Sequence, residues 1–148
     1  MSKSAAISQF NQQLAILKSA QGRFESSLFD IKQLVQADLL DSELDAARLL
    51  SKNKFYRAAG AIVGVVIEKH LAQVCINHSV VVSKKHPTIS DFNDLLKNNS
   101  VIEVPQWRFI QHLGDLRNLC DHNKGKEPSA AEIEDLISGA EKITKTLF

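Results

Sequence analysis

Arg117 and His122 are the residues of this sequence whose types and spacing best suit chemistry, within the stretch RNLCDHNKG at residues 117–125. A histidine near the C-terminal end of a helix suits acid–base chemistry around neutral pH, because its ordinary pKa lies close to neutrality. An arginine can bind a phosphate through two parallel hydrogen bonds. The stretch therefore indicates either half of an active site or a charged helix end that finishes in a histidine.

Spacing alone favours the charged helix end. On a straight helix Arg117 and His122 are about 140° apart around the axis, so they do not share a face. Arg117 can instead pair with Asp121, and Asn118 with His122, each four residues further along. Such exposed contacts contribute only about 0.3–0.5 kcal/mol per pair.

Most other recognised chemical motifs are missing. Gly60 and Gly64 lie in a helical pattern with no following GK[ST], so they form no phosphate-binding loop. There is no HExxH motif, and the five histidines lack metal-ligand spacing. The two cysteines, Cys75 and Cys120, form no CxxC pair and are expected to be buried thiols. We therefore expect neither a metal nor a cofactor.

The composition is that of a soluble globular protein, with 44% hydrophobic and 24% charged residues among 148. The net charge of +1 gives no global basic field of the kind that marks nucleic-acid binding, although residues 51–100 carry seven Lys/Arg against three acids. The N-terminus lacks the apolar core of a signal peptide, and the apolar run Ala58–Ile67 is too short to span a bilayer. We expect a cytoplasmic protein with no membrane association.

Hydrophobic periodicity predicts an all-α protein, an up-and-down bundle of five to six helices with a long N-terminal helix. The apolar positions of this first helix, about residues 4–39, alternate in steps of three and four, as in a heptad repeat. They are Ile7, Phe10, Leu14, Leu17, Phe24, Leu28, Ile31 and Val35, with Gln21 where an apolar residue is missing. A helix break at Gly22 is the competing prediction. These apolar residues form one stripe along the helix, which we call the seam. We expect the seam to pack within the fold, with pairing to a second copy as the alternative.

The remaining chain is predicted to form four or five helices. They are Glu43–Ser51 capped by Asp41 or Ser42, Lys54 to about His78, a helix from a Ser90 cap to Lys97, Pro105 to near His122, and a last helix after the capping box Ser129–Glu132. Asn123 or Gly125 can take the left-handed conformation in the turn before that last helix. The predicted domains are residues 1–40, a packing or dimerisation arm, and residues 41–148, which we expect together to be one compact unit.

The sequence LGDLRNLCDHNKGKEPSAAEIEDLISGAEKI resembles the C-terminal half of HEPN domains, helical modules common in prokaryotic toxin–antitoxin and defence systems. The signature of that family is an Arg followed after four to six residues by a His, most often with Asn, Asp or His directly after the Arg. Here these positions are Arg117, Asn118 and His122. Upstream, FYRAAGAIVGVVIEKHLAQV, which contains Glu68, and TISDFNDLLKNNSVI are similar to the earlier helices of the family, so the likeness covers roughly residues 45–148.

The resemblance implies a metal-independent endoribonuclease that acts as a toxin or phage-defence effector. The active members of the family work as homodimers in which two motifs face each other across a cleft, so one copy need not aim both groups at one spot. Cleavage of RNA without metal needs a base for the 2′-hydroxyl proton and a cation for the phosphorane charge. The resemblance gives these roles to His122 and Arg117, with Asn118 orienting the imidazole, and it implies a 2′,3′-cyclic phosphate product.

Further residues and partners follow from the same resemblance. Glu68 is expected to contact Arg117 through a hydrogen bond, with a structural ion pair as the equal alternative. The pair of Arg117 with Asp121, which the spacing predicts, would leave the motif idle if Asp121 held Arg117 out of the cleft. The candidate partners are RNA, a second copy and a cognate nucleotidyltransferase-like antitoxin. Three basic residues are candidates for holding the RNA backbone, with a solvated surface charge as the plainer interpretation of each: Arg108, Lys124 and Lys126.

Two other functions stay open. One is a non-catalytic HEPN-like helical module that binds a partner protein or a nucleotide, which the near-zero net charge favours mildly. A monomer in solution, or a dimer with distant motifs, would support it. The other is a helical interaction protein unrelated to RNA that uses the seam from Ile7 to Val35. It predicts that deletion of residues 1–40 abolishes all partner binding.

Overall fold

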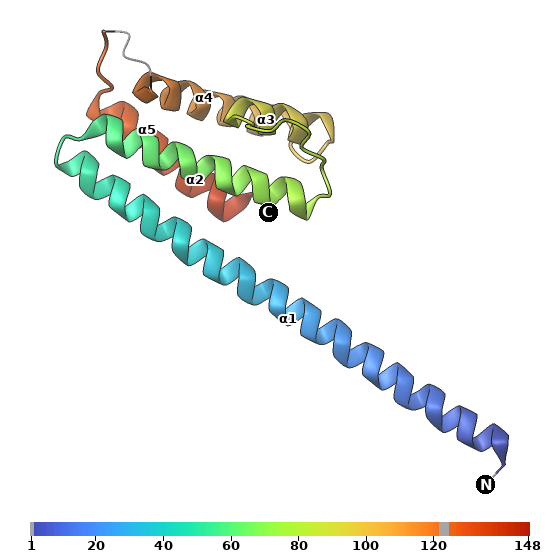
Figure 1. Ribbon diagram of the computed structural model, residues 1–148. Helices are drawn as coiled ribbons and strands as arrows, with labels where there is room; N and C mark the ends of the chain where they lie inside the picture. The colour runs from blue at the N-terminus through green and yellow to red at the C-terminus, as the bar shows by residue number, and fades with distance from the viewer. Residues whose placement is uncertain (1, 122–124) are drawn as a thin grey trace. The chain divides into compact units, whose positions relative to one another are not determined.

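The computed structural model describes residues 2–121 and 125–148, and 81% of them are helical (Figure 1). The helices of this part are α1 (Lys3–Lys52), α2 (Tyr56–Asn77), α3 (Ile89–Asn98), α4 (Val104–Asp121) and α5 (Ala130–Thr146). No strand occurs in the described residues. The prediction of an all-α bundle with a long N-terminal helix is confirmed, and the number of described helices is five.

The first helix is longer than predicted, because α1 continues through Asp41 and Ser42 to Lys52. The separate helix Glu43–Ser51 is therefore wrong, as is the break at Gly22, which lies inside α1. Leu40, Leu44 and Ala47 are spaced by four and three and are all buried, so burial of this face outweighs the capping preference of the two polar residues.

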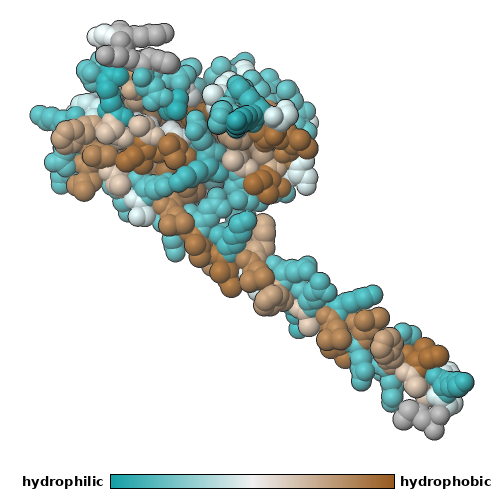
Figure 2. All heavy atoms as spheres, viewed as in Figure 1, coloured by the Kyte–Doolittle hydropathy of each residue, from teal (hydrophilic) through white to brown (hydrophobic). Residues whose placement is uncertain are grey.

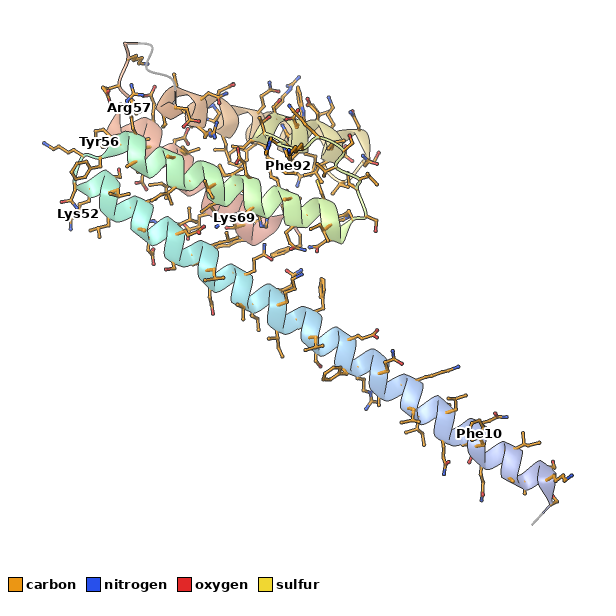
Figure 3. The ribbon with its side chains drawn as sticks, viewed as in Figure 1. Phe10, Lys52, Tyr56, Arg57, Lys69 and Phe92 are labelled. Carbon is orange, nitrogen blue, oxygen red and sulfur yellow. The ribbon has the colours of Figure 1, made fainter. Side chains whose placement is uncertain are left out.

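Contacts within the chain divide it into two units, Met1–Asp38 and Leu39–Phe148. We call the helical residues 3–38 of the first the N-terminal segment and the second the helical unit. A single helix cannot cover its own seam, and the seam side chains are 38% (Leu14) to 66% (Leu17) exposed. Phe10 in Figure 3 is an example. The seam therefore needs a partner, and its packing within the fold or against a second copy stays a prediction.

The core of the helical unit lies around α2 and α4. Helix α2 contacts α3, α4 and α5, and α4 also contacts α3 and α5. An apolar stripe of the last helix, continued by Leu147, is buried in this core. It consists of Ile133, Leu136, Ile137, Ala140, Ile143 and Leu147. The two cysteines, Cys75 and Cys120, are free thiols and are both buried, which confirms their prediction.

Two glycines of α2, Gly60 and Gly64, let α4 approach closely. A Cβ atom added at Gly60 would lie 2.7 Å from Cβ of Cys120, and one added at Gly64 would lie 2.7 Å from Cγ of Arg117. Real Cβ atoms do not come this near to other carbon atoms, so a side chain at either position would force a shift. At Gly60 the short Cys120 side chain leaves movement of α4 as the way out, whereas at Gly64 the Arg117 side chain would have to change its path. The end of α4 that carries Arg117 therefore packs directly on the backbone of α2.

The ends of the shorter helices follow local capping chemistry. Helix α3 is capped by Thr88 and not by Ser90, because the Thr88 N–H donates to the Asp91 carboxylate at 2.7 Å and forms the reciprocal box. The predicted box at Ser129 and Glu132 is confirmed. Gly125 has the predicted positive φ of 76°, whereas Asn123 lies outside the described residues. Pro105 is the second residue of α4, still in the first turn, where a missing N–H removes no helical bond.

Among the described residues, α2 is a helix whose length and composition would also allow it to cross a membrane. Of the apolar window in this helix, 56% is buried inside the structure, and the core helix of a soluble protein passes the same test. The cytoplasmic location therefore stays a prediction.

Candidate functional site

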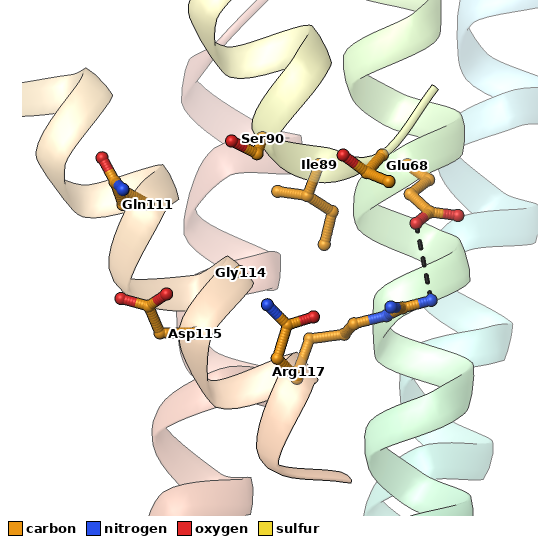
Figure 4. A pocket seen from close by; sticks show the side chains of 9 residues that line it. Glu68, Ile89, Ser90, Gln111, Gly114, Asp115 and Arg117 are labelled. Carbon is orange, nitrogen blue, oxygen red and sulfur yellow. Dashed lines mark ion pairs between the residues drawn. The ribbon is translucent and has the colours of Figure 1, made fainter. Parts of the chain in front are cut away.

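Arg117 lies in the last turns of α4 and extends its side chain across to α2, over Gly64 (Figure 4). Its Nη1 is 2.5 Å from Oδ2 of Asp121, one turn further along the same helix. Its Nη2 is 3.6 Å from Oε1 of Glu68 on α2. The two expected carboxylate contacts of Arg117 are therefore both present.

The Arg117 cluster is half-buried and carries an excess of negative charge. The side chains of Arg117, Glu68 and Asp121 are 27%, 29% and 30% exposed, so solvent screens these ion pairs less than it screens surface pairs. The Nε atom of Arg117 is buried and has no hydrogen-bond acceptor among residues 2–121 and 125–148. An unsatisfied buried donor costs about 1–3 kcal/mol. One guanidinium therefore faces two carboxylates and still has an unused donor.

Next to this cluster is a pocket of about 190 Å³ between α2, α4 and the beginning of α3 (Figure 4). Its lining combines two carboxylates, one guanidinium, two amides and two hydroxyls with two apolar positions. The residues are Glu68, Thr88, Ile89, Ser90, Gln111, Gly114, Asp115, Arg117 and Asn118. The pocket can therefore donate and accept hydrogen bonds, and it suits a polar ligand.

The charges around the pocket have opposing effects on an anion. Thr88, Ile89 and Ser90 belong to the N-terminal end of α3, where the helix dipole favours negative charge. Arg117 adds a formal positive charge, but Glu68 and Asp115 oppose it. A phosphate can bind well here only if it replaces a carboxylate on Arg117.

Asn118 lines the same pocket as Arg117, so the structure brings together two of the three proposed catalytic residues. His122 and Lys124 lie outside the described residues. The predicted contact of Asn118 with His122 and the acid–base role of His122 therefore stay predictions.

The predicted RNA-binding residues Arg108 and Lys126 do not line this pocket. Arg108 is exposed and lies nine residues before Arg117 on α4. Lys126 is also exposed, and its Nζ is 3.3 Å from Oε1 of Glu132 at the beginning of α5. Their contact with RNA stays a prediction, and it would have to occur away from the pocket.

Arg57 is a structural residue of this region that no sequence pattern singles out. From the first turn of α2, its Nη1 donates to the carbonyl oxygen of Cys120 at 3.0 Å, and its Nε donates to Glu127 at 2.9 Å. Its Nη2 also donates to the carbonyl oxygen of Lys126 at 3.4 Å. Arg57, labelled in Figure 3, thus fixes residues on both sides of the stretch that contains His122. These contacts span 63 to 70 positions of chain, so no local pattern reveals them.

Cys120 is not suited to act as a nucleophile, although it lies inside the motif. Burial is the main cause that raises its pKa, and the neighbouring charge of Asp121 adds to the effect. Its thiol lies 3.4 Å from the carbonyl oxygen of Leu116 in a hydrogen bond. In the described part of the chain, no group of three or more His, Cys, Asp or Glu residues could hold a metal ion.

No protein-family model, no curated protein and no solved structure matches this chain. The resemblance to the HEPN family rests on the motif and the order of helices around it, and membership of the family stays a prediction. The chemistry of the site must be argued from the residues themselves.

Proposed function

We propose that this chain is a HEPN-type, metal-independent endoribonuclease that acts as a toxin or phage-defence effector. The observation that supports the proposal most is that Arg117 and Asn118 line one pocket, together with the N-terminal end of α3. An arginine beside a helix N-terminus favours phosphate, because both groups favour negative charge. Here Asp91 already caps α3 and two carboxylates pair with Arg117, so the phosphate must displace a carboxylate from the guanidinium.

In the proposed reaction, His122 takes the proton from a ribose 2′-hydroxyl. The 2′-oxygen then bonds to phosphorus, and the bond from phosphorus to the 5′-oxygen breaks. Arg117 stabilises the negative charge that develops on the phosphorane, and His122 of a second copy protonates the leaving 5′-oxygen. The products are a 2′,3′-cyclic phosphate and a 5′-hydroxyl. This scheme requires a homodimer with two motifs at one cleft, acting in the cytoplasm, with a nucleotidyltransferase-like antitoxin as the candidate inhibitor.

The carboxylates around Arg117 give the proposed enzyme a resting state, in which the guanidinium is paired with carboxylates and not with a phosphate. Asp121 contacts the guanidinium more closely than Glu68 does, at 2.5 Å against 3.6 Å. A phosphate that binds Arg117 must compete with Asp121 for the guanidinium. The buried Nε of Arg117 could donate to it only if the side chain moves away from Gly64. Binding of RNA is therefore coupled to release of Arg117 from Asp121.

The experiment is cleavage of single-stranded RNA in EDTA by the purified full-length protein. His122→Ala should lower the cleavage rate by roughly 100-fold or more, because it removes the general base. His112→Ala is a matched control, since His112 is an exposed histidine on α4 that pairs with Asp135. It should cut like the wild type. Equal cleavage by the wild type and His122→Ala would refute the proposed site.

A non-catalytic module is the second candidate, and the double carboxylate contact of Arg117 favours it. In that case the pocket binds a nucleotide or a partner protein, and Arg117 is a structural residue. Asp121→Asn separates the two proposals because it frees Arg117 from its closer carboxylate. A restrained nuclease should cut RNA faster with this substitution, whereas a non-catalytic module should gain no cleavage.

A further inference from the structure

The N-terminal segment carries a heptad repeat of apolar residues along its seam, with charged residues beside it. Figure 2 shows apolar side chains at intervals along it. The heptad a positions are Ile7, Leu14, Gln21, Leu28 and Val35, and the d positions are Phe10, Leu17, Phe24, Ile31 and Asp38. All ten are exposed on the helix. This is more than four heptads, which is long enough for a stable two-stranded coiled coil.

We propose that residues 3–38 pair with the same residues of a second copy as an antiparallel coiled coil. The two-fold axis lies between residues 22 and 23, so each a position packs beside a d position of the partner. The layers from the centre outwards are Gln21 with the partner's Phe24, Leu17 with the partner's Leu28, Leu14 with the partner's Ile31, Phe10 with the partner's Val35, and Ile7 with the partner's Asp38.

The charges beside the seam select this direction and register. Lys18, Glu25 and Lys32 occupy e positions, which face each other across an antiparallel pair. In the proposed register, Lys18 of each copy faces the partner's Glu25, so two attractive pairs form. A shift of one heptad in one direction places Lys18 against the partner's Lys18. A shift in the other places Glu25 against the partner's Glu25 and Lys18 against the partner's Lys32.

A parallel pairing would leave the same charges without partners. In a parallel coil the e residues Lys18 and Glu25 face the partner's g residues Gln13 and Ala20, which are uncharged. It would also bring Asp38 of both copies together at a d position, where like charges repel. The g row is free of charge throughout, so the antiparallel pair meets no repulsion on that side. It consists of Ala6, Gln13, Ala20, Ser27 and Leu34.

Glu25 is oriented towards the seam in the unpaired helix. The Gln21 side-chain amide, at an a position, donates to Oε1 of Glu25 at 3.1 Å. Gln21 therefore brings the carboxylate to the edge of the seam, where Lys18 of an antiparallel partner would reach it. The polar Gln21 at a central layer also disfavours other registers, as buried polar residues do in coiled coils.

Cysteine cross-linking of the full-length protein tests the direction of the pair. Leu17→Cys and Leu28→Cys occupy one proposed layer, and the two native cysteines are buried. Under mild oxidation a mixture of the two variants should form a disulfide-linked dimer, while each variant alone should form none. Cross-linking of either variant with itself would indicate a parallel pair and overturn the proposal. A mixture that stays monomeric would overturn it as well.

A charge exchange tests the register without changing the seam. Lys18→Glu or Glu25→Lys should each raise the dissociation constant of the full-length protein roughly tenfold, and the double variant should restore it. Arg23→Glu, at an exposed c position, is the matched control and should have no effect. Failure of the double variant to restore association would overturn the register. In an antiparallel pair the two copies of residue 38 lie at opposite ends of the coil, roughly 50 Å apart, so this pair does not itself bring two Arg117 motifs to one cleft. The proposed nuclease would need a separate contact between helical units, and the RNA-cleavage assay tests it apart from the cross-linking of residues 17 and 28.

Discussion

The helical unit and the N-terminal segment contain similar apolar residues, but only the helical unit covers them with its own helices. Leu71 of α2, Leu113 of α4 and Leu136 of α5 have no exposed surface at all. Leu17 of the N-terminal segment is 66% exposed. In the helical unit several helices share one core, whereas the N-terminal segment is a single helix. Hydrophobicity thus specifies that a surface needs a partner, and only the arrangement of helices specifies which partner it has.

The largest expected difference in stability is between two leucine-to-alanine substitutions, one in each region. Leu71→Ala should lower the free energy of unfolding by about 2–5 kcal/mol, because it opens a cavity in the core. Leu17→Ala should change it by less than about 0.5 kcal/mol in a dilute sample, because this side chain is exposed. Urea unfolding followed by circular dichroism measures both. Comparable losses would mean that the seam is part of the same folded core.

Glycine-to-alanine substitutions in the two regions should change the free energy of unfolding in opposite directions. Gly60→Ala should destabilise the protein by about 1–3 kcal/mol, because its Cβ would collide with Cys120 on α4. Gly22→Ala should stabilise α1 by up to about 1 kcal/mol, because nothing lies within 4 Å of the added Cβ. Thermal unfolding of the two variants beside the wild type would show this. A stabilising Gly60→Ala would contradict the close packing of α2 on α4.

A pH effect should arise in the helical unit, since the N-terminal segment contains no histidine. Burial lowers the pKa of His70 below its ordinary value of 6.5, although its Nε2 lies 2.8 Å from the carbonyl oxygen of Leu147. The unfolded chain therefore binds a proton more readily, and this part of the stability is present above pH 6.5 and is lost as the pH falls through the lowered pKa. His70→Gln, which can still donate to that carbonyl, should weaken the pH dependence between pH 7 and 5. An unchanged slope would exclude His70 as its source.

The smallest expected effect concerns the cap of α3. Lys84 holds the pKa of Asp91 at about 2, with help from the backbone and side chain of Thr88, against an ordinary value of 3.8. This contribution to stability is present above pH 3.8 and is lost as the pH falls towards 2. Asp91→Asn should therefore destabilise the protein at pH 7 but make little difference near pH 2. Thermal unfolding across this range tests it, and a difference that persists at pH 2 would assign the effect to something other than the charge.

Local patterns predicted most of the helices, because periodicity and capping act over a few residues. The box at Ser129 and Glu132 and the left-handed Gly125 are examples. The end of α1 was predicted wrongly, because Asp41 and Ser42 can cap a helix, and only the burial of Leu44 decides that the helix continues. Burial depends on tertiary contacts that a sequence pattern does not contain.

The candidate site was likewise predictable only where its contacts are local in the sequence. The ion pair of Arg117 with Asp121 follows from their spacing on one helix, and it is present. The role of Arg57 was not predictable, because its partners Cys120, Lys126 and Glu127 are distant in the sequence. The pocket also combines residues from three helices, so its composition could be known only from the fold.

Cleavage of labelled single-stranded RNA in EDTA by the wild type and Arg117→Ala tests the proposed nuclease most directly. Arg23→Ala, an exposed arginine of the N-terminal segment, is the matched control, and circular dichroism checks that each variant is folded. We expect products with 2′,3′-cyclic phosphate ends from the wild type and from Arg23→Ala. We expect a loss of roughly 100-fold or more in rate for Arg117→Ala. Equal rates for the wild type and Arg117→Ala, or no cleavage by the wild type, would contradict the proposed role of Arg117 in RNA cleavage.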